Sequence, residues 1–255
     1  MKKLLIGGFL AVVIIAVVAV LAVGFFLDSA VKKGVETIGP QLTKVSVKLD
    51  SVGLSLLSGS GKINGLVVGN PEGYKTASAI NIGHASLAIS PGSLLSDKVI
   101  VKSIRVDAAE VTFEGGLSGN NLSKILDNVN AATGGDTTAP GGPQESEAGK
   151  KLQVDDFLMT GAKVNVSLKG MGGQSVTVPL PDIHLTGLGQ GSEGITSAEL
   201  TKLVLSEVIA AATKAAASDK VQEFAKGVTD AAGKAAGDAV NKATKSVTDL
   251  FKKKE

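Results

Sequence analysis

The 255-residue sequence contains no cysteine and no tryptophan, and its only histidines are His84 and His184. The missing cysteines exclude a disulfide framework, a thiolate metal site and a cysteine nucleophile. Two histidines are too few for a histidine-rich metal centre. Aromatic residues make up 3% of the chain and glycine occurs 32 times, which favours tight turns and slim strands over an aromatic-lined pocket. With 44% hydrophobic residues, the chain as a whole is expected to fold.

A long uncharged segment lies near the N-terminus. Leu4–Leu27 contains 24 residues without a charge. As a helix it would extend about 36 Å, enough to cross a hydrocarbon core of about 30 Å. It is longer than the apolar region of about 7–15 residues in a cleavable signal peptide, and it ends in bulky rather than small residues. Residues 1–27 are therefore predicted to be a transmembrane anchor with the body outside the cytoplasm. A cleaved signal peptide is the alternative.

The residues after this segment predict a β-rich body. Residues 28–42 are expected to form a short amphipathic or loop connector, and residues 43–195 the body. Apolar and polar residues alternate in short runs, which is typical of strands with one packed face. Glycine, proline, serine and asparagine separate the runs, as turns require. No long helix stands between the runs, so a curved antiparallel sheet is favoured and the fold class is mainly β with helices (α+β). Strands are expected over 45–49, 52–56, 62–68, 79–90, 98–106, 110–114, 153–159, 163–169, 175–178 and 182–186.

Two helices are predicted within and after this body. Residues 121–129 place four apolar side chains on one face, and Asn120 or Asn121 can cap the helix. Residues 131–150 have almost no apolar bulk and are expected to form a flexible loop. A second helix, 196–217, carries a strong apolar stripe and is expected to pack against the sheet. Thr196 and Glu199 have the spacing of a capping box at its start.

The last segment, residues 218–255, is predicted to be a basic, Ala/Lys-rich amphipathic tail. Its thin apolar stripe recurs every eleven residues, for example at Val228, Ala239 and Leu250, which is three helical turns. Such a helix could lie on anionic lipid, pack against its own body or another copy, or remain solvated. The pattern does not choose among these alternatives.

No motif in the chain predicts catalysis or a cofactor. Gly189–Gly194 fits G-x-G-x-x-G, but no second strand follows to carry the acidic residue of a dinucleotide site, so no nucleotide is expected. His84 and His184 lie in strand-like runs and are interpreted as surface or hydrogen-bonded residues. One arginine and one tyrosine leave little for base stacking, so no nucleic-acid partner is expected. The chain is predicted not to be an enzyme, and to hold no metal or cofactor.

Four segments occur in an order that resembles the AsmA-like family. They are the turn Asn70–Tyr74, the strand entry Ser93–Val101, the strand Ile104–Glu114 and the helix start Asn120–Leu126. With the N-terminal anchor, the resemblance covers about residues 1–130. It implies a sharply curved sheet, U-shaped in section, with an apolar inner face, similar in build to chorein-type bridge lipid-transfer proteins. It also implies a single-pass protein of the bacterial inner membrane whose body lies in the periplasm.

Two hypotheses for function follow. In the first, the protein binds membrane lipids in the apolar groove, or supports envelope lipid transport and outer-membrane integrity. In the second, the sheet packs shut as a core, and the C-terminal helix drives homo-oligomers or docks to an envelope protein complex. The residues expected to line or close the groove are Val45, Val47, Leu54, Leu56, Ile80, Ile82, Leu87, Ile89, Val99, Val101, Val111 and Phe113.

Overall fold

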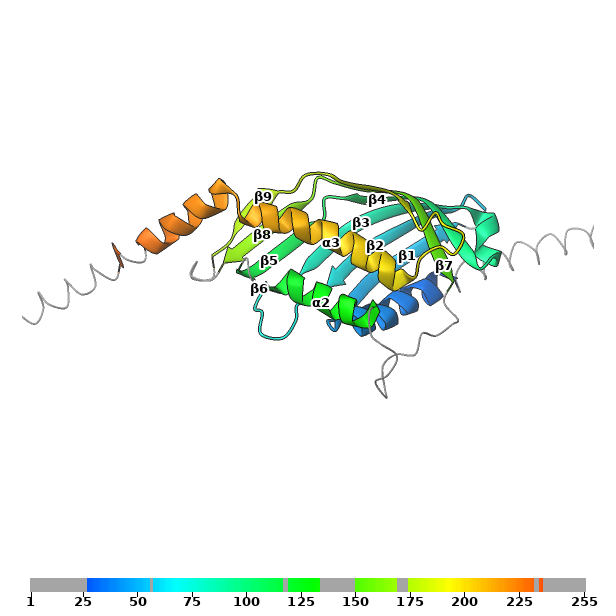
Figure 1. Cartoon of the computed structure of the whole chain (residues 1–255), viewed down its shortest axis with the longest axis horizontal. Helices are drawn as coiled ribbons and strands as arrows, with labels where there is room; N and C mark the ends of the chain where they lie inside the picture. The colour runs from blue at the N-terminus through cyan, green and yellow to red at the C-terminus, as the bar shows by residue number, and fades with distance from the viewer. Residues whose placement is uncertain are drawn as a thin grey trace, which may run out of the picture.

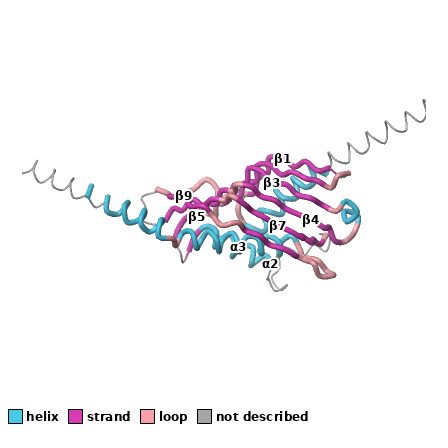
Figure 2. Tube along the Cα trace, turned by 90° about the horizontal axis from the view of Figure 1, so that it is seen from above, coloured by secondary structure: helices cyan, strands magenta, loops and turns pink. Residues whose placement is uncertain are grey.

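The computed structural model describes residues 27–55, 57–116, 119–133, 150–168, 174–231 and 234–235. It is a mixed α+β fold in which ten strands form one curled, open sheet and helices cover its hollow face (Figures 1 and 2). The strands are β1 (Val47–Ser55), β2 (Ser60–Val68), β3 (Ile80–Ile89), β4 (Lys98–Asp107), β5 (Glu110–Gly116), β6 (Gly119–Asn120), β7 (Lys151–Thr160), β8 (Lys163–Leu168), β9 (Val176–Pro179) and β10 (Ile183–Leu188). The helices are the 3₁₀ turn η1 (Pro91–Leu95), α2 (Asn121–Thr133) and α3 (Ser197–Ala216), together with helical residues 27–43 and 219–231.

No helix in these described ranges combines the length and apolarity needed to cross a membrane. The predicted anchor lies outside the described residues except for Leu27.

The prediction of an α+β fold with a curved sheet is confirmed, as is the capping box, in which Thr196 and Glu199 bond reciprocally at the start of α3. The predicted loop 131–150 falls mostly outside the described residues, and α2 extends to Thr133.

The expectation of an antiparallel sheet is wrong for two neighbouring pairs. β4 pairs with β7 in parallel, and β5 pairs with β8 in parallel. The chain reaches α2 at the end of β5, and the crossover that includes α2 brings it back to begin β7 beside the start of β4. Two parallel neighbouring strands must be joined by such a crossover. The helix α2 was predicted from the sequence, but the parallel pairing that it makes possible was not. The remaining pairings are antiparallel.

One transverse bend crosses the whole sheet. β4 and β5 form one broken strand, as do β7 with β8 and β9 with β10, and backbone hydrogen bonds of 2.9 Å continue across the breaks. At this line the inward-facing residues stand three apart instead of two, so the alternation changes phase at the bend in every long strand. The flanking inward residues are Leu49 and Val52, Ile63 and Leu66, Ile82 and Ala85, Val106 and Ala109, Met159 and Ala162, and Leu180 and Ile183.

Ala108 occupies a strained position in this bend. Its φ is 51°, a left-handed conformation that costs a residue with a Cβ about 1–2 kcal/mol. Gly161, at the same bend on the adjacent strand, has φ 62° and does not have that cost because it lacks a Cβ. We expect Ala108→Gly to stabilise the fold by about 0.5–1 kcal/mol after the added chain entropy of glycine is counted. Gly161→Ala should destabilise it. Urea unfolding of both variants checks the pair, and a destabilised Ala108→Gly would contradict the assignment of strain.

The helix over 27–43 protects the outer edge of β1. Asp28, Lys32 and Glu36 are spaced four apart and therefore share one face of the helix. Asp28 accepts a hydrogen bond from the backbone N–H of Leu54 (2.8 Å), and Glu36 accepts one from that of Leu49 (3.1 Å). The Lys32 ammonium donates to the carbonyls of Leu49 and Asp50. These side chains pair with backbone groups that an edge strand would otherwise expose. The predicted connector is thus a helix with a structural role.

Candidate functional site: an apolar cavity under α3

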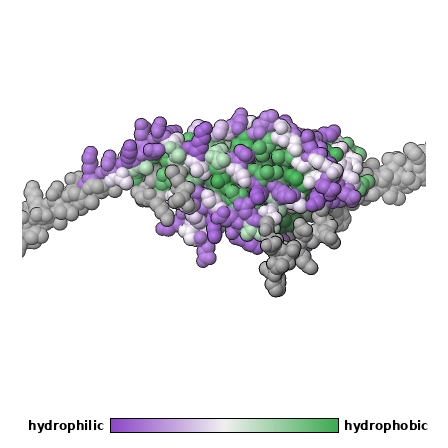
Figure 3. All heavy atoms as spheres, viewed as in Figure 1, coloured by the Kyte–Doolittle hydropathy of each residue, from purple (hydrophilic) through white to green (hydrophobic). Residues whose placement is uncertain are grey.

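The hollow face of the sheet is divided into a closed half and a partly open half. Over β5 and β8, the C-terminal part of α3 and the apolar face of α2 form a closed core, in which Val111, Phe113 and Val166 are fully buried. The N-terminal part of α3 crosses the other half of the face (Figure 1). Figure 3 shows apolar residues gathered across the middle of this face and framed by hydrophilic ones.

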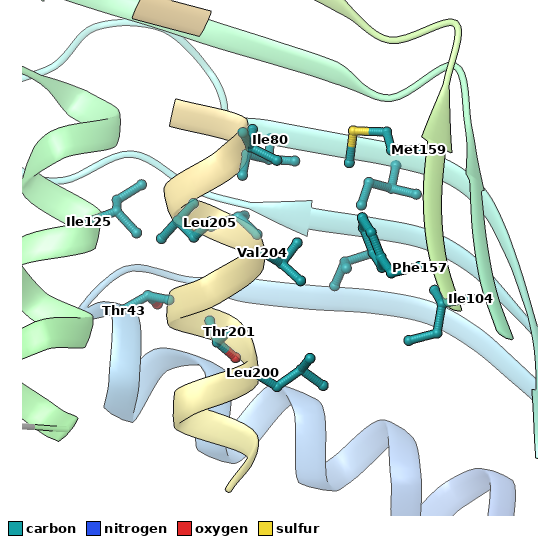
Figure 4. A pocket seen from close by; sticks show the side chains of 14 residues that line it. Thr43, Ile80, Ile104, Ile125, Phe157, Met159, Leu200, Thr201, Val204 and Leu205 are labelled. Carbon is teal, nitrogen blue, oxygen red and sulfur yellow. The ribbon is translucent and has the colours of Figure 1, made fainter. Parts of the chain in front are cut away.

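A cavity of about 280 Å³ lies beneath the N-terminal part of α3. This volume is just below the range of about 300–1,000 Å³ that is typical of small-molecule sites. α3 and the central strands supply most of the wall, and Figure 4 shows their side chains converging on the space. The lining residues are Thr43, Leu66, Val68, Ile80, Ile82, Ile104, Ile125, Phe157, Met159, Leu200, Thr201, Val204, Leu205 and Val208.

The cavity wall offers a ligand almost only hydrocarbon. Thr43 and Thr201 are the two residues of the wall that carry side-chain polar atoms. The Thr43 hydroxyl donates to the Gly39 carbonyl (2.8 Å), and the Thr201 hydroxyl donates to the Ser197 carbonyl (2.8 Å). Both donors are therefore already used within their own helices. An apolar wall of this kind favours an apolar occupant, because water held against it would lose hydrogen bonds.

The predicted groove residues are distributed over both halves of the hollow face. Ile80 and Ile82 line the cavity. Val45, Val47, Val111 and Phe113 are buried in the packed interior, and the last two have no exposed surface. Leu54, Leu87, Ile89, Val99 and Val101 are half-buried in the part of the sheet beyond the cavity, and Leu56 lies outside the described residues.

The sequence analysis missed most of the cavity wall. Leu200 and Val204 were read only as part of the packing stripe of a helix, and Phe157 and Met159 only as strand residues. Leu205 was not assigned to that stripe. Spacing along one strand indicates which residues share a face. It does not indicate where a helix will leave space above that face.

The two histidines are hydrogen-bonded on the strands, as predicted. His84 bonds to Asn64 (2.9 Å), and His184 bonds to Asp156 (2.6 Å). Asp156 also pairs with Arg105, so this cluster joins β10, β7 and β4. The hydrogen bond from Arg105, followed by that from His184, lowers the pKa of the Asp156 carboxyl below its ordinary value. Because the Asp156 carboxylate is ionised and paired with both side chains, it is suited to linking the three strands rather than to transferring a proton.

The glycine-rich loop Gly189–Gly194 has a packing role. A side chain at Gly189 would place its Cβ 2.5 Å from the Leu152 carbonyl oxygen, and φ at this residue is 69°. Glycine therefore allows the loop to cross closely over β7 before α3 begins. Within the described part of the chain, no three His, Cys, Asp or Glu side chains gather as a metal site would require.

Three of the four segments compared above with the AsmA-like family, Asn70–Tyr74, Ile104–Glu114 and Asn120–Leu126, contribute to one polar cluster. This polar clamp consists of Asn70, Thr76, Glu114 and Asn121. The Asn121 amide donates to Asn70 (2.8 Å) and to the Thr112 carbonyl (2.8 Å), and its oxygen accepts from the N–H of Glu114 (2.9 Å). The Asn70 amide donates to the Thr76 carbonyl and hydroxyl (2.7 Å each). The clamp holds the β2–β3 loop against β5 and the start of α2.

Glu114 makes the clamp sensitive to pH. Burial acts to raise the pKa of Glu114, but hydrogen bonds from the Thr76 hydroxyl (2.6 Å) and from the N–H groups of Lys75 and Thr76 hold the pKa below its ordinary value of 4.5. A pKa lowered by folding adds stability above the unfolded-state pKa, and this stability is lost as the pH falls through the folded-state pKa. We expect Glu114→Gln to lower stability at pH 7 and to reduce its fall below about pH 4.5. Unfolding free energies from pH 3 to 7 measure this, and parallel profiles for both proteins would contradict it.

Comparison of the chain with protein-family models, curated proteins and solved structures finds no match.

Proposed function

We propose that this protein is a non-enzymatic lipid-binding protein of the AsmA-like type, which holds acyl chains between its curled sheet and α3. The observation that carries the proposal is the cavity of about 280 Å³ with two threonine hydroxyls already bonded to helix carbonyls. Hydrocarbon is the ligand chemistry that such a wall stabilises, because burying its apolar surface needs no polar partner.

The proposal includes a location. The uncharged run Leu4–Leu27 would anchor the chain in a bacterial inner membrane as a single pass, with the body in the periplasm. There the protein would bind membrane lipids and support envelope lipid transport or outer-membrane integrity. A body of this size would not span an envelope alone, so transport across it would need further copies or partner proteins.

Half-buried apolar side chains extend the apolar surface beyond the cavity. Leu87 pairs in register with Ile104, a residue of the cavity wall, and Ile89 pairs with Val101. Residues paired directly across antiparallel strands share a face, so Leu87 lies on the hollow side of the sheet. An acyl chain seated in the cavity could continue along these residues.

The test is mass spectrometry of the lipids that the full-length protein retains after purification in a mild detergent and exhaustive detergent exchange. We expect phospholipid or free fatty acid to remain bound. Retention of neither, or of polar small molecules only, would contradict the proposal.

A further inference from the structure

Two leucines at one end of the sheet are almost fully exposed. Leu57 lies in the β1–β2 turn and is 87% exposed, and Leu95 lies at the end of η1 and is 94% exposed. The two loops touch, because the Ile89 N–H donates to the Gly59 carbonyl (2.6 Å) and a Cβ at Gly59 would come within 3.1 Å of Pro91. We refer to Leu57 and Leu95 as the leucine tip. These two leucines leave apolar surface on adjacent loops available to an apolar partner.

The N-terminal part of the chain enters the body at this same end. Asp28 bonds to the N–H of Leu54, three residues before Leu57. Residues 27–43 then lead away from the tip, since Glu36 reaches Leu49, further back along β1. The uncharged run Leu4–Leu27 therefore ends at the same end of the body as the leucine tip.

The other end of the body is distant from the tip. β3 begins there at Ile80 and ends at Ile89 beside η1, so the two ends of β3 mark the two ends of the sheet. α3 begins near β7 at the tip side, where Ile195 pairs with Leu152. The helix that follows it contacts β9 at the far side, where Lys220 donates to the Thr177 carbonyl (3.4 Å). The described chain thus enters at the tip end and leaves at the far end.

From these positions we propose that the leucine tip contacts a phospholipid bilayer, with Leu57 and Leu95 inserted at the level of the acyl chains. This inference rests on the membrane anchoring proposed above and adds the end of the body that faces the membrane. In that orientation the half-buried residues Leu87, Ile89 and Val101 lie between the bilayer and the cavity, so hydrocarbon could enter without crossing water. Charged residues of both signs lie near this end. Lys150 donates to the carbonyls of Leu94 and Ser96, next to Asp97, and Lys98 donates to the Gly191 carbonyl, two residues before Glu193. The contact is therefore not expected to require anionic lipid.

The absence of native cysteine allows a clean test with the full-length chain. A single cysteine at Ser58, beside Leu57, is labelled with an environment-sensitive fluorophore, and the protein is reconstituted into phosphatidylcholine vesicles that contain lipids spin-labelled near the top of the acyl chain. A cysteine at Glu72, in the β2–β3 loop at the far end, is the matched control. Flotation of the vesicles reports anchoring separately from tip contact.

We expect quenching at position 58 to exceed that at position 72 at least about threefold. Adding Leu57→Asp and Leu95→Asp to the Ser58→Cys protein should reduce quenching to the level at position 72, while the protein still floats with the vesicles. Equal quenching at the two positions, or quenching that survives the aspartates, overturns the inference. Floating protein with no quenching at position 58 overturns the tip contact and leaves the anchor standing. Protein that does not float overturns both. Lipid retained in the purified protein is measured in the same preparation and tests the cavity independently.

Discussion

Replacement of Val204 by tryptophan should remove most of the lipid that copurifies with the protein. Val204 projects from α3 into the cavity, between Leu200 and Leu205 (Figure 4). An indole at this position would occupy the space that an acyl chain needs. We expect at least a tenfold decrease in bound lipid, which corresponds to about 1.4 kcal/mol of lost binding free energy. Mass spectrometry with an internal lipid standard gives the ratio.

The matched control is Leu203→Trp. Leu203 is the preceding residue of the same helix, is 43% exposed and does not line the cavity. The same side chain there should leave bound lipid unchanged and leave unfolding near that of the wild type. If both tryptophan variants lose lipid equally, or if Val204→Trp retains it while folded, the cavity is not the binding site.

The order of the elements could be predicted from the sequence because local patterns determine it. The alternation in 98–106 predicts a strand, and β4 covers Lys98–Asp107. Asn120 was expected as a possible cap, and its oxygen accepts from the N–H of Ser123 (2.9 Å) at the start of α2. These features depend on residues a few positions apart, and side-chain period and capping chemistry act at that range.

The transverse bend could not be predicted in the same way. Within one strand, Gly83 and His84 look like an ordinary interruption of the alternation. The bend becomes a single feature only when strand pairing places His84 in register with Asn64 on β2 and with Asp107 on β4. The available signal was the repeated three-residue spacing of inward residues. It requires the register before it can be recognised.

The helix over 27–43 illustrates a different difficulty. Residues 28–42 were interpreted as a short amphipathic or loop connector, although the spacing of four between Asp28, Lys32 and Glu36 was visible in the sequence. Their role depends on β1 being an edge strand, and a single sequence does not state which strands lie at an edge. The cavity wall is a similar case, because the depth at which α3 lies over the sheet is set by packing rather than by period.

Replacing Asn121 by alanine should destabilise the protein more than replacing most other polar residues of the body by alanine. Asn121 is fully buried, and its amide group joins β5, α2 and the β2–β3 loop through Glu114, Thr112 and Asn70. Asn121→Ala leaves three polar groups without these partners, at about 1–3 kcal/mol for each one that stays unsatisfied. Allowing for some relaxation, we expect a loss of about 3–4 kcal/mol in the free energy of unfolding. Urea titration followed by circular dichroism measures it.

A second asparagine of α2, Asn128, provides a control for the loss of a single hydrogen bond. Asn128 is half-buried, and its amide donates to the Thr43 carbonyl alone (2.8 Å), so Asn128→Ala should cost only about 1 kcal/mol. Asn121→Asp keeps the oxygen that accepts from Glu114 but replaces the donor facing two other oxygens. It should therefore destabilise the protein at pH 7 at least as much as Asn121→Ala does. The large loss expected for Asn121→Ala arises because the substitution removes the hydrogen-bond partners of Glu114, Thr112 and Asn70 together. If Asn121→Ala and Asn128→Ala destabilise the protein equally, or if Asn121→Asp is well tolerated, the polar clamp does not hold the loop.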